Sequence, residues 1–497
     1  MSVLDFLDPT MFDSAYGNIL PLLDCESVHA ICRELQYAIR DEQQVFVYGD
    51  YDMDGFCSML VWREVFAMLN AKPPVFFKYS SRTHLLDRDI IRQVGASSCK
   101  LVLICDTGSS IEDYGILNIL KLYGYLPAVI DHHVYYSDYG KDKHSTLMFN
   151  SYEERALFGG HEVSGAYASL LVANVLCEKY MGVSIPFGAK VAALASMYAD
   201  VVDMSTPVAR ALYNSTVYPP LTAPLLFSGL NKYNYWIGRR LFSYIISPKI
   251  NGCFRTGSFD LLNSCVAESD KYKLNNLVEQ LVTVHSDSRK FTRSLLPLFS
   301  QEVVGDFMVF CYDNSTDAGV VRNFTGVVAT MLAKQELRAV VVLVKLDKMY
   351  VGSVRDYYQR DLLSSFKLFC DAGGHPPSFG ISFQDMTEFK RHLQHLNSNN
   401  VVGSGKSYTS LSSGLLSDIG DIRALALYNE YMNVRPTVVL SHTCNGVKLL
   451  RKTKYNYYYD VGLPGGMSVM TSRRLADNVQ VMLEPVICRG VELREMV

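Results

Sequence analysis

The sequence predicts an α/β protein with a mostly parallel sheet near its start and β-rich segments near its end. Short apolar runs at residues 45–47, 75–79, 101–105 and 128–130 alternate with helical patterns, as the strands of a parallel sheet do. A long amphipathic helix is predicted from about residue 270 to 298. Later strands are expected at residues 307–311, 339–344, 437–441, 455–461 and 479–486. The predicted order is therefore a large α/β domain, a long connecting helix, a smaller α/β domain and a β-rich C-terminal region.

The composition is that of a soluble globular protein. The 497 residues, 49% hydrophobic and 20% charged, suffice for roughly two to four domains. The net charge of -3 neither supports nor excludes a nucleic-acid partner, because a basic groove can exist in a balanced chain. The 12 cysteines form no CxxC pair, which favours reduced thiols in the cytoplasm over structural zinc. We find no signal peptide and no apolar run of membrane-spanning length.

The most informative stretch is VFVYGDYDMDGFCS, residues 45–58. After the apolar run, three aspartates occupy alternating positions: Asp50, Asp52 and Asp54. An apolar stripe predicts a helix over residues 57–69, so the carboxylates lie between a strand's carboxyl end and a helix start, where open α/β sheets bind ligands. Close carboxylates repel one another unless a cation neutralises them, and Mg²⁺ or Mn²⁺ suits oxygen ligands. Taken alone, such a stretch is more often a solvated acidic turn.

Two further strand ends carry similar side chains. Asp106 follows the run at residues 101–105, and Asp131, His132 and His133 follow the run at residues 128–130. Because parallel strands end at the same edge of a sheet, these side chains are expected to meet there. Asp200 follows an apolar helix predicted over residues 191–197, where a buried acid needs a partner or a metal. Imidazole among carboxylates shifts the preferred metal towards Mn²⁺, with Mg²⁺ still possible.

The motifs GDYDMDG, CDTG, DHH and YADVV together resemble the DHH phosphoesterase superfamily. Within it, the chain looks most like the RecJ-type exonucleases, which are specific for single-stranded DNA and digest it in the 5′→3′ direction. The stretch SPKINGCFRTG is similar to that family's PxINAxGRxG segment and aligns Asn251 and Arg255 with it. Arg82 aligns with an arginine that follows the second strand.

Three downstream segments resemble the associated DHHA1 domain. DAGVVRNFTGVVATML is similar to the start of that domain, and VGSVRD aligns Ser353 and Arg355 with its Gly-Ser-x-Arg segment. AGGHPPSFG aligns Gly373, Gly374 and His375 with its Gly-Gly-His loop. The resemblance covers about residues 40–390. It departs from the family at residues 84–87, where Gly-Tyr-Gly is usual, and at residues 376–379, where small residues are usual; both stretches lie near the expected substrate.

The resemblance implies four parts. They are a DHH domain over residues 1–215, a helical connector over 216–300, a DHHA1 substrate-binding domain over 301–396, and a linker with a β-rich C-terminal region over 397–497. The last part is rich in Tyr, Lys and Arg, as at Tyr457 and Lys448. Such residues either bind single strands or form an ordinary strand with a solvated basic turn, and the sequence leaves both readings open.

The resemblance also implies roles for the candidate residues. The metal ligands are Asp50, Asp52, Asp54, Asp106, His132 and Asp200. Asp106 would bridge two divalent ions, Mn²⁺ or Mg²⁺, and Asp131 would orient His132. His133 would contact the scissile phosphate or the leaving oxygen, so we assign the catalytic set as His133, Asp131 and Asp106. Substrate phosphates would be held by Arg82, Asn251, Arg255, Ser353, Arg355, Gly373, Gly374 and His375.

The function expected from this resemblance is exonuclease activity on single-stranded DNA, from the 5′ end, by two-metal activation of water. One alternative is an oligoribonuclease or cyclic-dinucleotide phosphodiesterase. Another is a non-catalytic replication or repair scaffold with the same fold. The expected partner is single-stranded nucleic acid, DNA more than RNA, with a single-strand-binding or repair protein as a further candidate. No membrane partner is expected.

Overall fold

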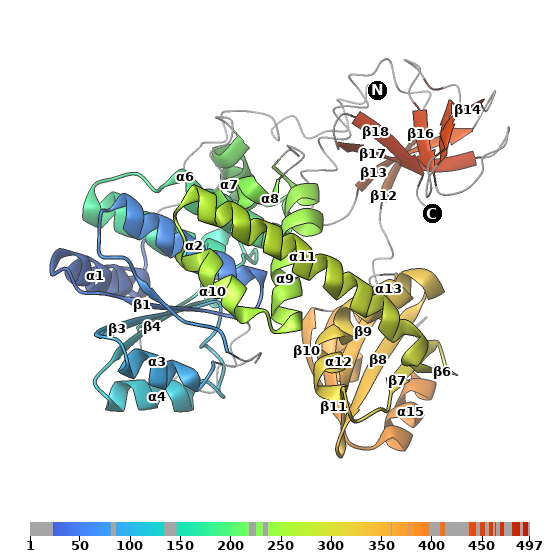
Figure 1. The fold of residues 1–497 in the computed structure, drawn as a ribbon, viewed down its shortest axis with the longest axis horizontal. Coiled ribbons are helices and arrows are strands. Elements are labelled where there is room, and N and C mark those ends of the chain that lie inside the picture. Colours follow the sequence, from blue (N-terminus) through green and yellow to red (C-terminus); the bar gives the residue numbers. More distant parts are fainter. Residues whose placement is uncertain are drawn as a thin grey trace. The chain divides into compact units, whose positions relative to one another are not determined.

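The computed structural model describes most of the chain in two compact units (Figure 1). It covers residues 23–80, 86–133, 147–217, 225–231, 237–358, 360–375, 377–396, 408–412, 437–443, 448–452, 457–460, 463, 468–471, 480–487 and 491–495. One unit combines Met1–Leu281 with Tyr408–Val497, and the other is Val282–Ser407. The four-part division from the sequence stays a prediction. Among the described residues, no helix has both the length and the apolar character needed to cross a membrane.

The first unit contains a five-stranded sheet in the order β2-β1-β3-β4-β5, with every pair parallel. Its strands are β1 (Phe46–Gly49), β2 (Val75–Phe76), β3 (Leu101–Cys105), β4 (Leu126–Asp131) and β5 (Leu147–Asn150). This confirms the predicted α/β class with a parallel sheet. The run at residues 75–79 forms a strand of only two residues, and β5 is a strand that the apolar pattern did not reveal.

Helices cover both faces of this sheet, with α2 on one side and α3 and α4 on the other in Figure 1. The helices of this part are α1 (Glu26–Arg40), α2 (Met53–Met68), α3 (Asp89–Gly95), α4 (Tyr114–Leu122), η5 (Arg155–Phe158), α5 (Gly165–Val175), η6 (Leu176–Met181) and α6 (Phe187–Ala199). The helix α2 begins four residues before the predicted start, because Asp52 caps it by accepting hydrogen bonds from the backbone N–H groups of Asp54 and Gly55.

Further helices follow in the same unit. They are α7 (Pro207–Val217), α8 (Leu225–Leu230), η7 (Arg240–Ile246), α9 (Ser247–Thr256), α10 (Phe259–Ala267) and the long α11 (Lys271–Leu295), whose last turns lie in the second unit. The predicted helix at residues 270–298 is therefore present and continues into η8 (Leu296–Leu298). The Pro-rich turn expected at residues 219–224 lies outside the described residues.

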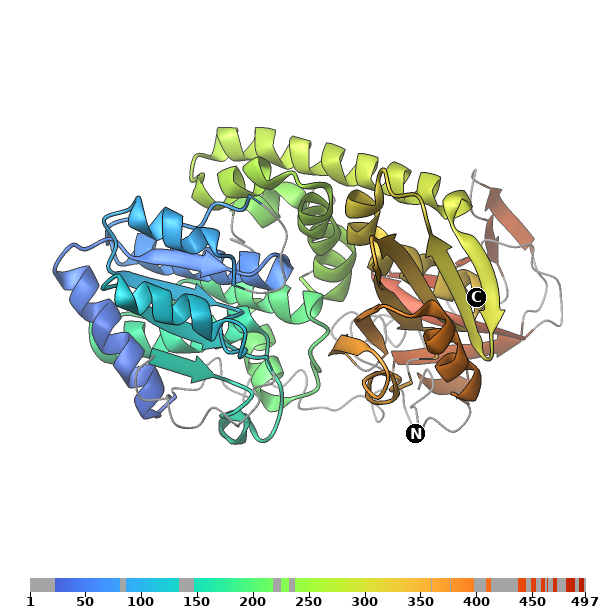
Figure 2. The same cartoon turned by 90° about the horizontal axis from the view of Figure 1, so that it is seen from below.

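The second unit contains a mixed six-stranded sheet in the order β10-β11-β9-β8-β7-β6, in which only β7 and β8 pair in parallel. Its strands are β6 (Ser300–Val304), β7 (Phe307–Tyr312), β8 (Ala339–Leu346), β9 (Met349–Asp356), β10 (Asp371–His375) and β11 (Ser378–Phe383). Its helices are α12 (Ala318–Val321), η9 (Arg322–Phe324), α13 (Thr325–Glu336), α14 (Leu363–Phe366) and α15 (Met386–His395). Figure 2 shows the same sheet after a turn of 90° about the horizontal axis.

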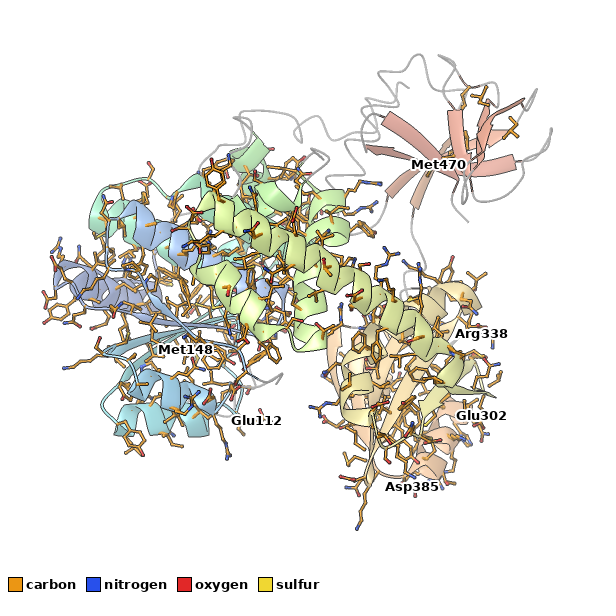
Figure 3. The ribbon with its side chains drawn as sticks, viewed as in Figure 1. Glu112, Met148, Glu302, Arg338, Asp385 and Met470 are labelled. Carbon is orange, nitrogen blue, oxygen red and sulfur yellow. The ribbon has the colours of Figure 1, made fainter. Side chains whose placement is uncertain are left out.

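The central strand β8 is buried on both faces of the sheet, because apolar side chains occupy consecutive positions along it. On β8, Val340, Val342 and Val344 join a core with α12 and α13. The intervening residues Val341 and Leu343 join a core with α14 and α15 on the opposite face. Glu302 on β6 and Asp385, which caps α15, mark this unit in Figure 3.

The described residues of the C-terminal region form a seven-stranded sheet in the order β12-β13-β17-β18-β16-β15-β14. They are β12 (Tyr408–Ser412), β13 (Thr437–Thr443), β14 (Lys448–Lys452), β15 (Tyr457–Asp460), β16 (Ser468–Thr471), β17 (Gln480–Ile487) and β18 (Val491–Glu495). The predicted β-rich character is confirmed. The basic and tyrosine side chains proposed for nucleic-acid binding lie outside the described side chains, so both readings of the tail stand as predictions.

Candidate metal centre

The carboxyl edge of the parallel sheet gathers the predicted acidic residues and histidines. Asp50 directly follows β1, Asp106 directly follows β3, and Asp131 is the last residue of β4. Asp54 lies in the first turn of α2, and Asp200 directly follows α6. The parallel register of β1, β3 and β4 aligns these strand ends, so the chain delivers carboxylates from distant segments to one place.

His132 lies at the centre of the cluster. Its Nε2 atom is 3.1 Å from Asp106 Oδ1 and 3.6 Å from Asp54 Oδ2. Its Nδ1 atom is 3.8 Å from Asp200 Oδ2. Two overlapping groups in the described structure place their ligand atoms within 4.8 Å of one another: Asp54 with His132 and Asp200, and Asp106 with His132 and His133. Four of the residues predicted as ligands therefore lie close together, namely Asp54, Asp106, His132 and Asp200, and their role as metal ligands stays a prediction.

The first residues of α5 bind the Asp54 carboxylate through their backbone N–H groups. Its two carboxylate oxygens accept hydrogen bonds from the backbone N–H groups of Gly165 and Ala166, both at 2.7 Å. Ser196 on α6 donates a third hydrogen bond at 2.6 Å, and its hydroxyl also contacts Ser164. A carboxylate at a helix N-terminus is electrostatically favourable. The contacts therefore fix the orientation of Asp54 towards His132.

Several of these acids are poorly stabilised by the protein alone. Burial and the Asp52 carboxylate raise the pKa of Asp50 to about 8. Burial raises the pKa of Asp54 to about 6, with Asp200 adding to the rise and His132 opposing it. Burial and the carboxylates of Asp54 and Asp52 raise the pKa of Asp106 well above its ordinary value.

The donor set fits divalent cations. The Oδ1 atoms of Asp50 and Asp106 are buried and accept no hydrogen bond from any described residue. Buried carboxylate oxygens without donors are costly unless a cation binds them. Oxygen ligands with one imidazole suit Mn²⁺ or Mg²⁺. Asp54, Asp106, His132 and Asp200 would hold such ions, with Asp50 beside them.

Asp52 has a more local role than the other acids. Its side chain is exposed and its Oδ1 atom caps α2, accepting from Asp54 N–H at 2.7 Å and Gly55 N–H at 3.1 Å. It does not belong to either group of clustered ligand atoms. The assignment of Asp50 and Asp52 as direct ligands therefore stays a prediction, while their negative charges contribute to the raised pKa of Asp106.

Asp131 contacts a different histidine ring from the one expected. We expected Asp131 to orient His132, but its Oδ1 atom lies 2.8 Å from Nδ1 of His133. From His132 it receives only the backbone N–H, at 2.7 Å. Burial opposes ionisation of Asp131, yet His133 brings the pKa of this carboxyl below its ordinary value. Against the opposing effect of the partial burial of the ring, the same ion pair raises the pKa of His133 to about 10.

The acidic turn is also anchored through two tyrosines that the sequence did not single out. Tyr51 donates a hydrogen bond to Asp87 Oδ2 at 2.5 Å, and Tyr79 donates one to the backbone oxygen of Asp50 at 3.0 Å. The rings of Tyr51 and Tyr79 pack edge-on at 4.8 Å. Phe254 on α9 lies 4.9 Å from Tyr79, which places α9 beside the acidic turn. Arg82 lies outside the described residues.

The remaining predicted substrate residues fall into two sets. Asn251 and Arg255 lie on α9, the helix whose Phe254 packs beside the acidic turn. Asn251 has a buried Oδ1 atom that accepts no hydrogen bond from the described residues. The other set lies in the second unit and comprises Ser353, Arg355, Gly373, Gly374 and His375.

The second set is brought together by strand register. On β11, Gly380 pairs with Ser353 of β9 on one side and with Gly373 of β10 on the other. Two rows further along, Ser378 pairs with Arg355 and with His375. Residues directly opposite one another in a sheet share a face, and so do rows two apart. Ser353, Gly373, Arg355 and His375 therefore lie on one face of the sheet, and Gly374 lies in the row between them.

Arg355 has the environment of an anion-binding group. Burial lowers the pKa of its guanidinium to about 10. Its Nη1 atom donates to the backbone oxygens of Val354 and Phe379, and no described carboxylate forms an ion pair with it. A Cβ atom on Gly326, near the start of α13, would lie 2.9 Å from its Nη2 atom. Close to this guanidinium, the hydroxyls of Ser353 and Thr325 form a hydrogen bond at 2.9 Å.

The raised pKa values predict opposite pH effects with and without metal. Because the folded pKa of Asp50 and Asp54 lies above the unfolded value, the metal-free fold holds extra protons and loses stability as pH rises from about 4 towards 8. Metal binding needs ionised carboxylates, so its affinity rises over the same range. In thermal unfolding, the gain in Tm on adding Mn²⁺ to EDTA-treated protein should be larger at pH 8 than at pH 6. An equal gain at both pH values would contradict the ligand assignment.

One protein family and several solved structures are similar to this chain. Residues 44–199 match the DHH family, N-terminal domain. The structure is similar to RecJ from Thermus thermophilus in complex with Mn²⁺, with a TM-score of 0.74, 20% identity, and coverage of 96% of this chain and 72% of that one. For the same protein with Mg²⁺ the TM-score is 0.67, at 18% identity and 97% and 71% coverage.

A third structure, an exonuclease RecJ bound to manganese, gives a TM-score of 0.57 at 21% identity, covering 76% of this chain and 96% of that one. No curated protein matches the sequence. The family match is thus limited to residues 44–199, which include the parallel sheet and the acidic cluster up to Ala199. The fold of the chain as a whole is RecJ-like, which confirms the resemblance drawn from the motifs.

Proposed function

We propose that this protein is a metal-dependent phosphodiesterase that degrades single-stranded DNA from its 5′ end. The observation that carries the proposal is the convergence of Asp54, Asp106, Asp200 and His132 at the carboxyl edge of the parallel sheet. This cluster lies in a RecJ-like fold that extends over 96% of the chain. The printed descriptions of the similar RecJ structures name Mn²⁺ and Mg²⁺, which suits the carboxylate and imidazole donors here.

The cluster would act by holding two ions against the phosphodiester. Divalent ions supply Lewis acidity that stabilises the attacking and leaving oxygens. Asp106, between the carboxylates that raise its pKa, is the proposed bridging ligand. The Nδ1 atom of His133 is hydrogen-bonded to Asp131, and the side chain is 57% exposed. Its Nε2 atom is therefore the one that we propose contacts the scissile phosphate or the leaving oxygen.

The second unit would hold a terminal phosphate. Arg355 offers a half-buried guanidinium without a described acidic partner, and guanidinium binds phosphate through two parallel hydrogen bonds. Ser353 offers a hydroxyl beside it, and the start of α13 lies close by. On β10, Gly373 lies in the same row as Ser353 and His375 in the same row as Arg355, with Gly374 in the row between them. Arg82, Asn251 and Arg255 are proposed to contact phosphates further along the strand.

Removing the guanidinium tests the terminal-phosphate site. Arg355→Ala should weaken binding of 5′-phosphorylated single strands by about 10- to 100-fold, the loss expected for hydrogen bonds to a charged group. Strands with a 5′-hydroxyl should lose much less. The control is Arg391→Ala, which removes an exposed arginine on α15 of the same unit. Equal losses for both kinds of end would mean that Arg355 contacts the backbone at any position.

A cleavage assay separates the candidate functions. Labelled single-stranded DNA, duplex DNA, short oligoribonucleotides and cyclic dinucleotides would be incubated with Mn²⁺ or Mg²⁺. We expect stepwise removal of nucleotides from single-stranded DNA, starting at the 5′ end. Faster turnover of oligoribonucleotides or cyclic dinucleotides would favour the small-substrate alternative. If the protein neither binds metal nor cleaves any of these substrates, the non-catalytic scaffold would be favoured. The cytoplasmic location and any single-strand-binding or repair protein partner stay predictions.

A further inference from the structure

Asn150 lies beside the candidate site, on a strand that the sequence did not predict. It is the last residue of β5, the strand marked by Met148 in Figure 3. Parallel pairing places it opposite Asp131 at the end of β4. Its side chain is almost fully buried, with 5% of the residue exposed. A buried amide must satisfy both its oxygen and its nitrogen, so its contacts reveal what it holds in place.

The two halves of this amide make different contacts. The Oδ1 atom accepts hydrogen bonds from the backbone N–H groups of Tyr152 at 2.9 Å and Glu153 at 3.3 Å, which closes the turn after β5. The Nδ2 atom donates to Ser109 Oγ and to the backbone oxygen of His133, both at 3.0 Å. The oxygen therefore serves the local turn, and the nitrogen reaches two segments of the site.

The hydrogen bonds form a chain with a fixed direction. Ser109 donates its hydroxyl to Asp131 Oδ2 at 2.6 Å, so the Ser109 oxygen is available to accept from Asn150. Asp131 Oδ1 accepts from Nδ1 of His133 at 2.8 Å. The amide thus orients the hydroxyl, the hydroxyl orients the carboxylate, and the carboxylate orients the imidazole. A second contact from the same amide fixes the backbone of His133 directly.

We propose that Asn150 is a positioning residue for His133, acting through Ser109 and Asp131 and through the His133 backbone oxygen. The inference rests on the proposed function, in which the exposed Nε2 atom of His133 contacts the scissile phosphate or the leaving oxygen. Asn150 itself touches no substrate. Its contribution is to keep one imidazole orientation, because a misplaced catalytic group loses much of its effect.

Asn150→Asp separates the two halves of the amide. The variant keeps an oxygen to close the turn but loses both N–H donors, and it turns a carboxylate towards the Ser109 hydroxyl. That hydroxyl would then leave Asp131. We expect kcat for single-strand cleavage to fall by about 10- to 100-fold, as for residues that orient the groups of a metal site. KM and the affinity for Mn²⁺ should stay at their wild-type values.

Two further variants control this test. Ser151→Ala removes a buried hydroxyl next in the chain that has no described hydrogen-bond partner, and it should leave kcat unchanged. Ser109→Ala removes the middle of the hydrogen-bond chain and should lower kcat less than Asn150→Asp, since the Ser109 backbone N–H still contacts Asp131. The two losses should combine with less than additive effect, because both act through Asp131.

A spectroscopic readout tests the positioning without cleavage. Protein labelled with ¹⁵N-histidine and loaded with Mg²⁺ should show a protonated, slowly exchanging Nδ1 for His133, identified by its loss in His133→Gln. Asn150→Asp should abolish that signal in folded protein, and Ser151→Ala should keep it. An unchanged ring signal with an unchanged kcat would overturn the proposal. If the wild type cleaves no nucleic acid, the proposed function fails, and the ring signal alone decides the role of Asn150.

Discussion

Asp106→Asn is expected to lower metal-dependent cleavage by about 10³-fold or more, which corresponds to ~4 kcal/mol of lost transition-state stabilisation. Asp106 is buried, and its Oδ1 atom has no described hydrogen-bond donor while lying 3.1 Å from His132 Nε2. Asparagine keeps the shape but supplies a neutral oxygen, which binds a divalent cation weakly. The residue has a φ of 64°, a left-handed conformation that asparagine tolerates better than most residues.

The same substitution should leave the fold intact, and this separates a loss of chemistry from unfolding. Burial and neighbouring carboxylates raise the pKa of Asp106, so its removal relieves charge repulsion in the metal-free state. Without metal, the Tm of Asp106→Asn at pH 8 should equal or exceed that of the wild type, and its gain in Tm with Mn²⁺ should shrink. Asp203→Asn, an exposed acid close to Asp200 in the chain, serves as the control. Cleavage at the wild-type rate by the folded variant would exclude Asp106 as a metal ligand.

The sequence predicted the cluster because several of its residues follow apolar strands. The strand β3 has the predicted bounds, and Asp106 comes directly after it. In a parallel sheet, strand polarity alone sends such residues to one edge. No three-dimensional information was needed to bring Asp106 and His132 together. For Asp200 the signal was an acid at the end of an apolar helix, and α6 ends immediately before it.

The supporting residues could not be predicted in this way. Asp54 receives its hydrogen bonds from Gly165 and Ser196, which are 111 and 142 positions away in the chain. No periodic pattern marks such contacts, because they depend on how α2, α5 and α6 pack. Asn150 ends a strand of four residues whose short apolar run, residues 147–149, was not predicted as a strand. Ser109 directly follows the CDTG motif and was not part of it. Its role is recognised only from the hydrogen bond that its hydroxyl donates to Asp131 in the structure.

The partner of Asp131 was predicted wrongly for a local reason. Adjacent positions at the end of a strand point to opposite faces, whereas positions two apart share a face. Asp131 ends β4, so the ring within reach is that of His133, two residues on, and not that of His132. His132 instead points among Asp54, Asp106 and Asp200. The sequence predicted that Asp131, His132 and His133 lie at the site. The alternation of side chains along the strand decides which imidazole ring each carboxylate contacts.

Gly165→Ala is expected to disable the proposed metal centre although it replaces none of the proposed ligands. A Cβ atom at this position would lie 2.4 Å from Asp106 Oδ1 and 2.7 Å from Asp106 Cβ, closer than real atoms approach. Since the second contact is with the root of the side chain, Asp106 cannot relieve it by rotating its carboxylate alone. The Gly165 N–H also donates to Asp54 Oδ2 at 2.7 Å. The added methyl group would therefore displace two proposed ligands together.

The expected result for Gly165→Ala is a loss of about 10- to 100-fold in Mn²⁺ affinity, as for other residues that orient metal ligands, with a parallel loss of cleavage at limiting metal. Isothermal titration calorimetry measures the first and the cleavage assay the second. Gly115→Ala is the matched control: it makes the same change near the start of α4, where a Cβ atom would meet nothing within 4 Å. That control should keep metal affinity and gain up to about 1 kcal/mol of helix stability, the general advantage of alanine over glycine. If Gly165→Ala binds Mn²⁺ as tightly as Gly115→Ala does, the start of α5 does not set the ligand geometry, and Asp106 and Asp54 tolerate more movement than their packing indicates.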